Sequence, residues 1–246
     1  MTEHGTLEAN ICRHCQNRCI SCSHGSPWAK PYFMEPDQLA RDLDALKKVL
    51  TVQQFYCLGG EPLLHPRILD LLDVGRASGI AKENCILTNG RLLPKMPEAF
   101  WTKLDVIRIS VYPTLDRSVI ELAEQKKKQY GFYLGLDFIS TFWKQFEVSF
   151  DGRTFDKCPW KGGCWTVHDG YFYLCPQSAF FTDQFMGLAQ NIDGLPLHDG
   201  LTDESFKAYL NRKEPYNACR ICHSYKVQVP WREAGSLEEW IQESTI

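Results

Sequence analysis

The chain has 246 residues, 44% of them hydrophobic, which is enough to bury a core in one large domain or in a large domain with an appendage. A net charge of -3 at pH 7 excludes bulk electrostatic attraction to nucleic acid or to an anionic membrane. The sequence shows neither an export signal nor an apolar run of about eighteen residues, so we expect a cytoplasmic protein.

Helices and strands alternate from about residue 36 onward. Helical patterns cover residues 36–50, 65–79, 97–104 and 115–129, and apolar strand patterns cover 52–60, 84–90, 106–113 and 130–138. This alternation predicts parallel strands joined by right-handed crossovers, which either a barrel or an open sheet satisfies.

The pattern changes after residue 150. Short aromatic pieces separated by Gly, Pro and Asp follow, and we expect no long helix before about residues 202–210. We therefore expect two units that share an interface, at residues 1–150 and 151–246.

Eleven cysteines are many for such a chain, and an odd number without an export signal argues against a disulfide framework. Four of them lie in residues 12–22 and five in residues 158–222, a distribution that favours metal or redox chemistry. Cys57 and Cys85 stand between the two groups in apolar runs, where we expect them to be core residues.

Three cysteines of the first group, Cys15, Cys19 and Cys22, have the spacing C-x3-C-x2-C. One loop with this spacing can bind three irons of a [4Fe-4S] cluster and leave the fourth iron without a protein ligand. Ferredoxin loops follow another order and carry a proline. Zinc is the alternative, but structural zinc sites usually draw their CxxC pairs from separated segments.

Together with two further motifs, this spacing resembles the radical SAM enzymes. Gly59-Gly60-Glu61-Pro62, at the end of the second strand, is similar to the family's GGEP motif, and Asn89 and Ser110 follow at the next strands. The resemblance implies a partial (β/α)6 TIM-like barrel that binds S-adenosylmethionine at the open iron. It also implies cofactor contacts at Gly59, Gly60, Glu61, Asn89 and Ser110, with Glu61 accepting hydrogen bonds from the ammonium group.

The second cysteine group extends the resemblance to the rest of the chain. Cys158, Gly170 and Cys175 have the spacing C-x11-G-x4-C, and Cys219 and Cys222 form a later CxxC pair. This is similar to a Twitch domain, a small α+β unit whose four cysteines hold an auxiliary [4Fe-4S] cluster. By themselves, the four cysteines would equally suit zinc.

The resemblance implies an enzyme that cleaves S-adenosylmethionine to a 5'-deoxyadenosyl radical and abstracts hydrogen from an unactivated carbon. The short layout with two clusters is similar to the aminoglycoside and cyclitol enzymes of the family. It implies a small polar substrate, such as a sugar, aminoglycoside or cyclitol, and a flavodoxin- or ferredoxin-type electron donor.

Cys164, in the segment PWKGGCW, has no assigned ligand role. A thiol can return hydrogen to a substrate radical from the opposite face, so we predict epimerisation of a carbinol carbon with Cys164 as the donor. The alternatives are dehydrogenation of a secondary alcohol through the auxiliary cluster, and Cys164 as a substitute ligand or an idle thiol. A non-catalytic iron-sulfur or zinc protein is a further alternative, but it leaves GGEP unexplained.

Overall fold

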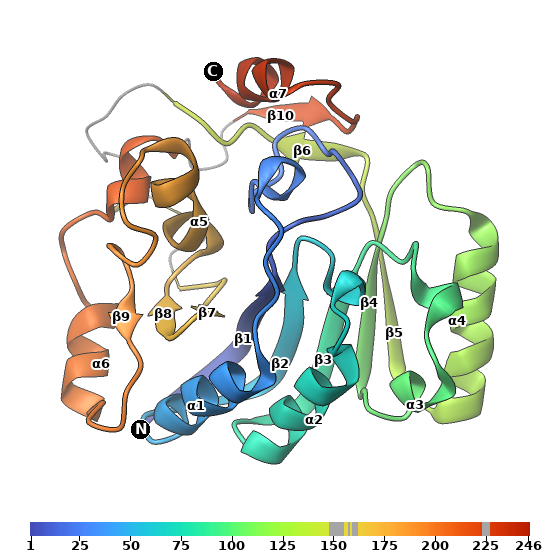
Figure 1. The fold of residues 1–246 in the computed structure, drawn as a ribbon, viewed down its shortest axis with the longest axis horizontal. Helices are drawn as coiled ribbons and strands as arrows, with labels where there is room; N and C mark the ends of the chain where they lie inside the picture. Colours follow the sequence, from blue (N-terminus) through green and yellow to red (C-terminus); the bar gives the residue numbers. More distant parts are fainter. Residues whose placement is uncertain (148–154, 157, 159–161, 223–226) are drawn as a thin grey trace.

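The computed structural model describes residues 1–147, 155, 156, 158, 162–222 and 227–246. Within them, a sheet of eight strands has the order β5-β4-β3-β2-β1-β7-β8-β9 (Figure 1). Its strands are β1 (Thr2–Cys12), β2 (Leu50–Gly59), β3 (Ala81–Thr88), β4 (Val106–Val111), β5 (Tyr133–Phe138), β7 (Thr166–His168), β8 (Tyr171–Tyr173) and β9 (Leu195–Pro196). Strands β1 to β5 and β7 pair in parallel, whereas β8 and β9 are antiparallel.

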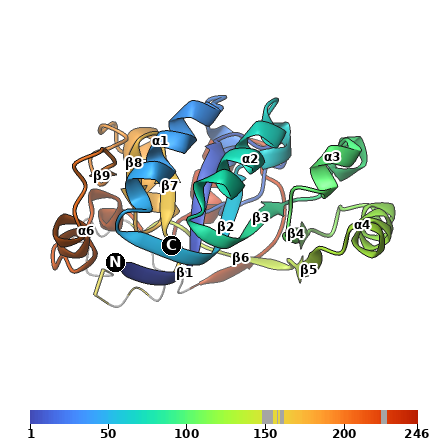
Figure 2. The same ribbon diagram turned by 90° about the horizontal axis from the view of Figure 1, so that it is seen from below.

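Helices connect the parallel strands, and α1, α2 and α3 lie on one side of β1 to β5 (Figure 2). The helices are α1 (Pro36–Leu46), α2 (Ile68–Ser78), α3 (Glu98–Trp101), α4 (Arg117–Tyr130), α5 (Pro176–Phe185), α6 (Asp203–Leu210) and α7 (Leu237–Ser244). Short 3-10 helices are η1 (Ser26–Trp28), η2 (Pro62–Leu64), η3 (Leu93–Lys95) and η4 (Asn217–Arg220). This is the expected α/β architecture of a partial barrel.

The sheet does not continue beyond β5 in the described part of the chain. Strand β6 (Thr141–Trp143) pairs instead with β10 (Gln228–Pro230) in a separate antiparallel ribbon. This ribbon and α7 lie together at one end of the sheet (Figure 1). The barrel is therefore open on the β5 side.

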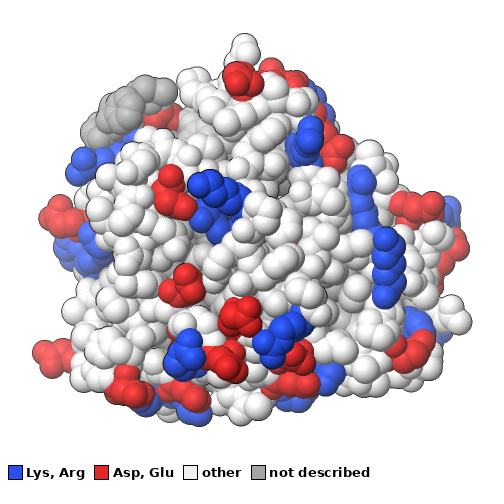
Figure 3. Space-filling model, in the orientation of Figure 1, with Lys and Arg blue, Asp and Glu red and all other residues white. Residues whose placement is uncertain are grey.

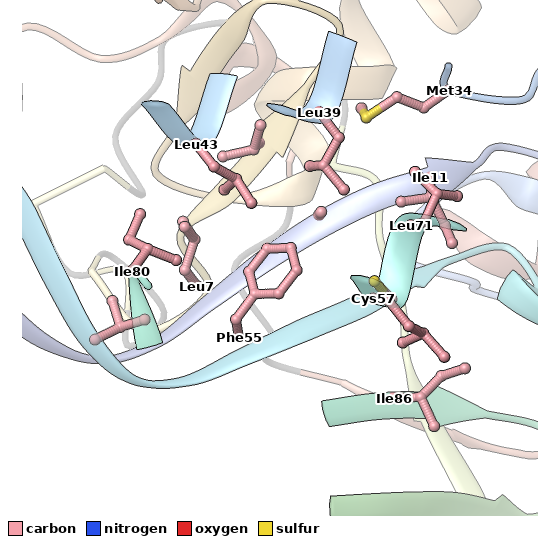
Figure 4. Packing of buried hydrophobic residues seen from close by; sticks show 14 of the residues in the cluster. Leu7, Ile11, Met34, Leu39, Leu43, Phe55, Cys57, Leu71, Ile80 and Ile86 are labelled. Carbon is pink, nitrogen blue, oxygen red and sulfur yellow. The ribbon is translucent and has the colours of Figure 1, made fainter. Parts of the chain in front are cut away.

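The core between the helices and the sheet follows from the apolar patterns of the sequence. Leu39 and Leu43 on α1 are fully buried, and Phe55 on β2 lies among Leu7, Leu43 and Ile80 (Figure 4). Helix α2 ends as the sequence predicts, because Gly79 takes the left-handed conformation with φ 67°. Cys57 is fully buried in the same core, and Cys85 is fully buried on β3, which confirms both as core residues.

The second half of the chain extends the sheet of the first. Strand β7 lies parallel to β1, with Glu8 opposite Thr166. A two-residue turn leads to β8, in which Asp169 and Gly170 have φ of 47° and 85°, as a type I' hairpin requires. The Gly170 amide donates to the Asp42 carboxylate on α1 at 3.0 Å. The predicted boundary near residue 151 lies outside the described residues.

One prediction about this half is wrong, because α5 is a ten-residue helix that precedes residue 202. Its residues from Pro176 to Thr182 are all buried. Because the polar Gln177, Ser178 and Thr182 are buried together with the apolar side chains, the sequence lacks the amphipathic period by which helices are recognised.

The surface carries both signs of charge. Basic and acidic side chains interleave along the lower edge of the face shown in Figure 3. Of the helices in the described residues, none is long and apolar enough to cross a membrane.

Core packing gives a testable prediction about stability. We expect Phe55→Ala to lower the free energy of unfolding by about 3–5 kcal/mol, because Phe55 is 0% exposed and the cavity left behind cannot close fully. Phe138→Ala is the matched control, because Phe138 is 73% exposed on β5. Its substitution should lower the free energy of unfolding by less than about 0.5 kcal/mol. Denaturant titration of the variants measures both, and equal losses would contradict the assignment of the core.

Candidate functional site

The carboxyl ends of the first four strands meet at one edge of the sheet. Strand β1 ends at Cys12, β2 at Gly59 and β3 at Thr88, and Ser110 lies near the end of β4. The segment 13–25, called the cluster loop below, leaves β1 at this edge. In parallel α/β sheets, the ends of several strands at this edge commonly build the active site.

A cavity of about 250 Å³ lies at this edge, between the cluster loop and the strand ends. It brings together seven residues predicted from the sequence: Cys15, Cys19, Cys22, Gly59, Gly60, Asn89 and Ser110. Segments that are far apart in the sequence thus form one site, as the motif order predicts.

The two glycines are required by the backbone of the cluster loop. Gly59 has φ 146°, and a Cβ on it would lie 2.1 Å from the Cys12 carbonyl oxygen. A Cβ on Gly60 would lie 2.2 Å from the His14 oxygen. The Gly60 amide donates to the Cys12 oxygen at 2.7 Å, and the Glu61 amide donates to the His14 oxygen at 3.0 Å. Only glycine permits this close approach.

Glu61 lies behind the cavity wall and does not line the cavity. It is fully buried, and its carboxylate accepts hydrogen bonds from the Thr88 hydroxyl at 2.6 Å and from the Leu63 and Asn89 amides at 3.1 and 2.9 Å. Burial raises the pKa of Glu61 to about 7, although the three hydrogen bonds lower it. In this geometry, Glu61 holds Thr88 and Asn89 in place at the cavity.

Nitrogen donors surround the thiols of the cluster loop. Cys15 Sγ accepts from the Asn17 amide at 3.4 Å and from the Asn89 side chain at 3.6 Å, and Cys19 Sγ accepts from the Trp231 indole at 3.2 Å. Burial raises the pKa of the Cys19 thiol to about 12, so it is protonated at neutral pH until a metal displaces the proton.

The arrangement fits a [4Fe-4S] cluster. The three thiols line one cavity, and Cys19 and Cys22 both raise the pKa of Cys15, which places the three thiols close together. Three neighbouring thiolates can each bind a different iron of one cluster.

Tyr112 also lines this cavity, although the sequence did not single it out. Burial raises its pKa, and the neighbouring Cys19, Cys22 and Cys15 raise it further, which places the phenol close to all three thiols. Its position two residues after Ser110, at the carboxyl end of β4, is the sequence signal that could have identified it.

The second cysteine group also gathers in space. Burial raises the pKa of Cys175 to about 11, with a contribution from Cys158, and Cys175 and Cys222 contribute to the raised pKa of Cys219. Cys175 is the N-cap of α5 and Cys219 lies in η4, so two packed helices carry these thiols. Cys158 and Cys219 are therefore both neighbours of Cys175, and Cys222 is a neighbour of Cys219.

A second cavity, of about 410 Å³, lies on the inner face of the sheet and shares Leu58, Leu87, Ser110 and Ile139 with the first. We call it the inner chamber. Its polar side chains are Thr6, Glu8, Gln54, Tyr56, Arg108, Ser110 and Asp137. Because the two cavities share walls, a molecule in the inner chamber would lie next to the cysteine cavity.

Glu8 is the carboxylate of the inner chamber that has no cation beside it among the described residues. The Arg108 guanidinium donates two hydrogen bonds to the Asp137 carboxylate, at 3.0 and 2.6 Å. Among the described residues, Glu8 accepts one long hydrogen bond, from the Thr166 hydroxyl at 3.5 Å. Burial raises the pKa of Glu8 to about 7. Sequence reasoning missed Glu8, although it is an acidic residue between the apolar Leu7 and Ala9 of β1.

Cys164 lies next to Glu8, just before β7. Burial raises the pKa of its thiol to about 12, and the Glu8 carboxylate, Cys175 and Cys158 raise it further. Its carbonyl accepts from the Thr166 hydroxyl at 3.0 Å. Cys164 is absent from the described residues that line the two cavities, and its neighbours are Glu8 of the inner chamber and Cys175 and Cys158 of the second thiol group.

The sequence profile of the radical SAM superfamily matches residues 9–134, which hold the cluster loop, the GGEP motif, Asn89 and Ser110. The chain belongs to this superfamily. Membership implies a [4Fe-4S] cluster and S-adenosylmethionine as cofactors.

Individual relatives match parts of the chain. GTP 3',8-cyclases from Streptomyces coelicolor and Chlorobaculum tepidum are 28% and 33% identical over 45% and 42% of it. The matched segments span only 36% and 31% of those two proteins.

A solved structure matches nearly the whole chain. It is BtrN in complex with AdoMet and 2-DOIA, which is 16% identical, covers 91% of this chain and 94% of that chain, and has a TM-score of 0.54. The likeness confirms the α/β fold over both halves of the chain.

The cluster loop gives a prediction about iron content. We expect Cys19→Ala to lose about four irons per chain and all cleavage of S-adenosylmethionine, because one iron loses its ligand, while the second thiol group keeps its iron. Cys57→Ala is the control, since it removes a thiol that is buried in the core and does not line the cavity. Iron analysis and assay of 5'-deoxyadenosine measure the outcome, and full cleavage by Cys19→Ala would show that the ligand is another cysteine.

Glu61 gives a prediction about cofactor binding. We expect Glu61→Ala to keep near-normal iron but to bind S-adenosylmethionine at least tenfold more weakly, because loss of three hydrogen bonds releases Thr88 and Asn89 at the cavity. Equilibrium binding to the reconstituted protein measures this effect. Unchanged affinity would exclude a role for Glu61 in the cofactor site.

Proposed function

We propose that this enzyme abstracts hydrogen from a carbinol carbon of a small polar substrate and oxidises that carbon to a ketone. The observation that carries the proposal is the inner chamber, a polar cavity that shares four wall residues with the cysteine cavity and contains the carboxylate of Glu8. The match to a structure that holds AdoMet together with 2-DOIA supports a small-molecule substrate.

The chain's own residues would divide the work between the two cavities. Cys15, Cys19 and Cys22 would hold the cluster, which when bound supplies the electron that cleaves S-adenosylmethionine. Gly59, Gly60, Asn89 and Ser110 would contact that cofactor, because they line the same cavity. The side chains of the inner chamber would bind hydroxyl and amino groups of the substrate and hold one carbon toward the shared wall.

Oxidation needs two further steps after one hydrogen atom has left the carbon. The hydroxyl must lose its proton, and the carbon must lose one electron. Glu8 is placed to accept the proton, since its pKa of about 7 leaves it partly ionised at neutral pH. Cys158, Cys175, Cys219 and Cys222 would hold the auxiliary [4Fe-4S] cluster, which when bound supplies an acceptor for the electron.

Epimerisation is the second candidate, and Cys164 is the observation that favours it. Its raised pKa keeps the thiol protonated at neutral pH, as a hydrogen donor must be, and Glu8 lies beside it. We rank oxidation first because Glu8 lines the inner chamber whereas Cys164 does not line either of these cavities, as far as the described residues show. In both cases, a flavodoxin- or ferredoxin-type protein would deliver the first electron.

The proposal predicts a distinct phenotype for Glu8→Gln. In a panel of aminocyclitols and amino sugars, we expect cleavage to 5'-deoxyadenosine to continue in this variant while ketone formation falls about a hundredfold, because the proton acceptor is gone. With the native protein, ketone formation should rise with pH through about 7, since only the ionised carboxylate accepts a proton, and this dependence should disappear in Glu8→Gln.

The same assay in heavy water separates the two candidate reactions. A ketone that lacks solvent deuterium, formed equally well by Cys164→Ala, supports oxidation. An inverted carbon carrying one deuterium, lost in Cys164→Ala, would establish epimerisation instead. Normal ketone formation by Glu8→Gln would remove Glu8 from the reaction.

A further inference from the structure

The last part of the described chain packs directly on the cluster loop. This part, residues 231–246, is called the C-terminal clamp below. The Ile20 amide donates to the Arg232 carbonyl at 2.9 Å, and the Ser21 amide donates to the Ser244 hydroxyl at 3.0 Å. Ser21 has φ 57°, a conformation that non-glycine residues rarely adopt, and it is fully buried. The clamp therefore helps to hold the loop in a constrained shape.

Two indole groups of the clamp bond to one residue of the loop. The Trp231 Nε1–H donates to Cys19 Sγ at 3.2 Å, and the Trp240 Nε1–H donates to the Cys19 carbonyl oxygen at 2.9 Å. Trp240 is fully buried, and its ring stacks on Phe185 with centroids 5.5 Å apart. Of the two indoles, Trp231 bonds to the sulfur atom and Trp240 bonds to the backbone, so they have different roles.

The indole of Trp231 is held in its orientation from two directions. Its backbone amide donates to the Ser140 carbonyl at 2.9 Å, and its ring stacks on Tyr112 with centroids 5.3 Å apart. Tyr112 in turn lines the cysteine cavity. An indole has a single N–H and no acceptor, so this bond to sulfur is the polar contact that the side chain can make.

We propose that Trp231 is a positioning residue that raises the reduction potential of the cluster bound by Cys19. A donor aimed at a cluster sulfur stabilises negative charge, and the reduced cluster carries one more negative charge than the oxidised cluster. The bond therefore favours the reduced form, from which the electron for cleavage of S-adenosylmethionine comes. The inference rests on the proposed function, in which Cys19 is a ligand of that cluster.

The test compares Trp231→Phe with Trp240→Phe in the full, reconstituted protein. Each variant loses one indole N–H that bonds to Cys19, but only the first loses the bond to sulfur. The readout is a redox titration followed by electron paramagnetic resonance, using the reduced-cluster signal that changes when S-adenosylmethionine is added. That response marks the cluster with the open iron, so the auxiliary cluster does not interfere.

We expect Trp231→Phe to lower the ratio of reduced to oxidised cluster at a fixed potential about tenfold, which corresponds to about 59 mV for one electron. Trp240→Phe should leave the ratio unchanged. An unchanged ratio in Trp231→Phe overturns the inference. Equal shifts in both variants also overturn it, because they would report a general loosening of the loop.

A second measurement applies if Trp231→Phe fails to hold its cluster. The Trp240→Phe variant, which keeps Trp231, is labelled with 15N-indole tryptophan and should show a nitrogen coupling to the same reduced-cluster signal in pulsed resonance spectra. Absence of this coupling overturns the inference. The ligand assignment fails separately, if Cys19→Ala keeps the signal that responds to S-adenosylmethionine.

Discussion

Three thiols have to be held at one place by a segment with almost no regular secondary structure, and the rest of the site depends on this constraint. The close approach of Gly59 and Gly60 to the backbone of Cys12 and His14 anchors the start of the cluster loop to the second strand. Arg13 adds an ion pair to Asp183 on α5, with bonds of 2.7 and 3.2 Å. The position of the loop is thus set by a strand end and by a helix from the other half of the chain.

The pairing of β7 with β1 joins the two halves of the chain in one sheet. Strand β1 carries Glu8 on its inner face and leads into the cluster loop, whereas β7 follows Cys164 and leads to the hairpin before Cys175. The two registered pairs, Glu8 with Thr166 and Ala9 with Val167, thus join the strand that leads to the first thiol group to the strand that leads to Cys175.

Much of the fold and of the cysteine cavity could be predicted from the sequence, because periodic apolar residues and closely spaced motifs are local signals. Helix α5 escaped prediction because polar and apolar side chains are buried together over its first seven residues, and the ion pair that it makes with Arg13 was therefore not predicted either. Glu8 escaped prediction because one acidic residue in a strand forms no motif, and its place in the inner chamber depends on residues of β2, β4 and β5 that are distant in the sequence. The contact between Trp231 and Cys19 was not predicted, because 212 residues separate them and neither segment carries a motif that indicates the other.

That long separation has a consequence for how the protein matures. During synthesis the cysteines of the loop leave the ribosome early, long before the clamp that bonds to Cys19 and Ser21 exists. Until the clamp is made, Ser21 lacks its partner Ser244, and the loop stays open to solvent. Iron and sulfide delivered before the clamp has been synthesised would meet a loop without these partners, so we expect insertion of the cluster to follow synthesis of the clamp.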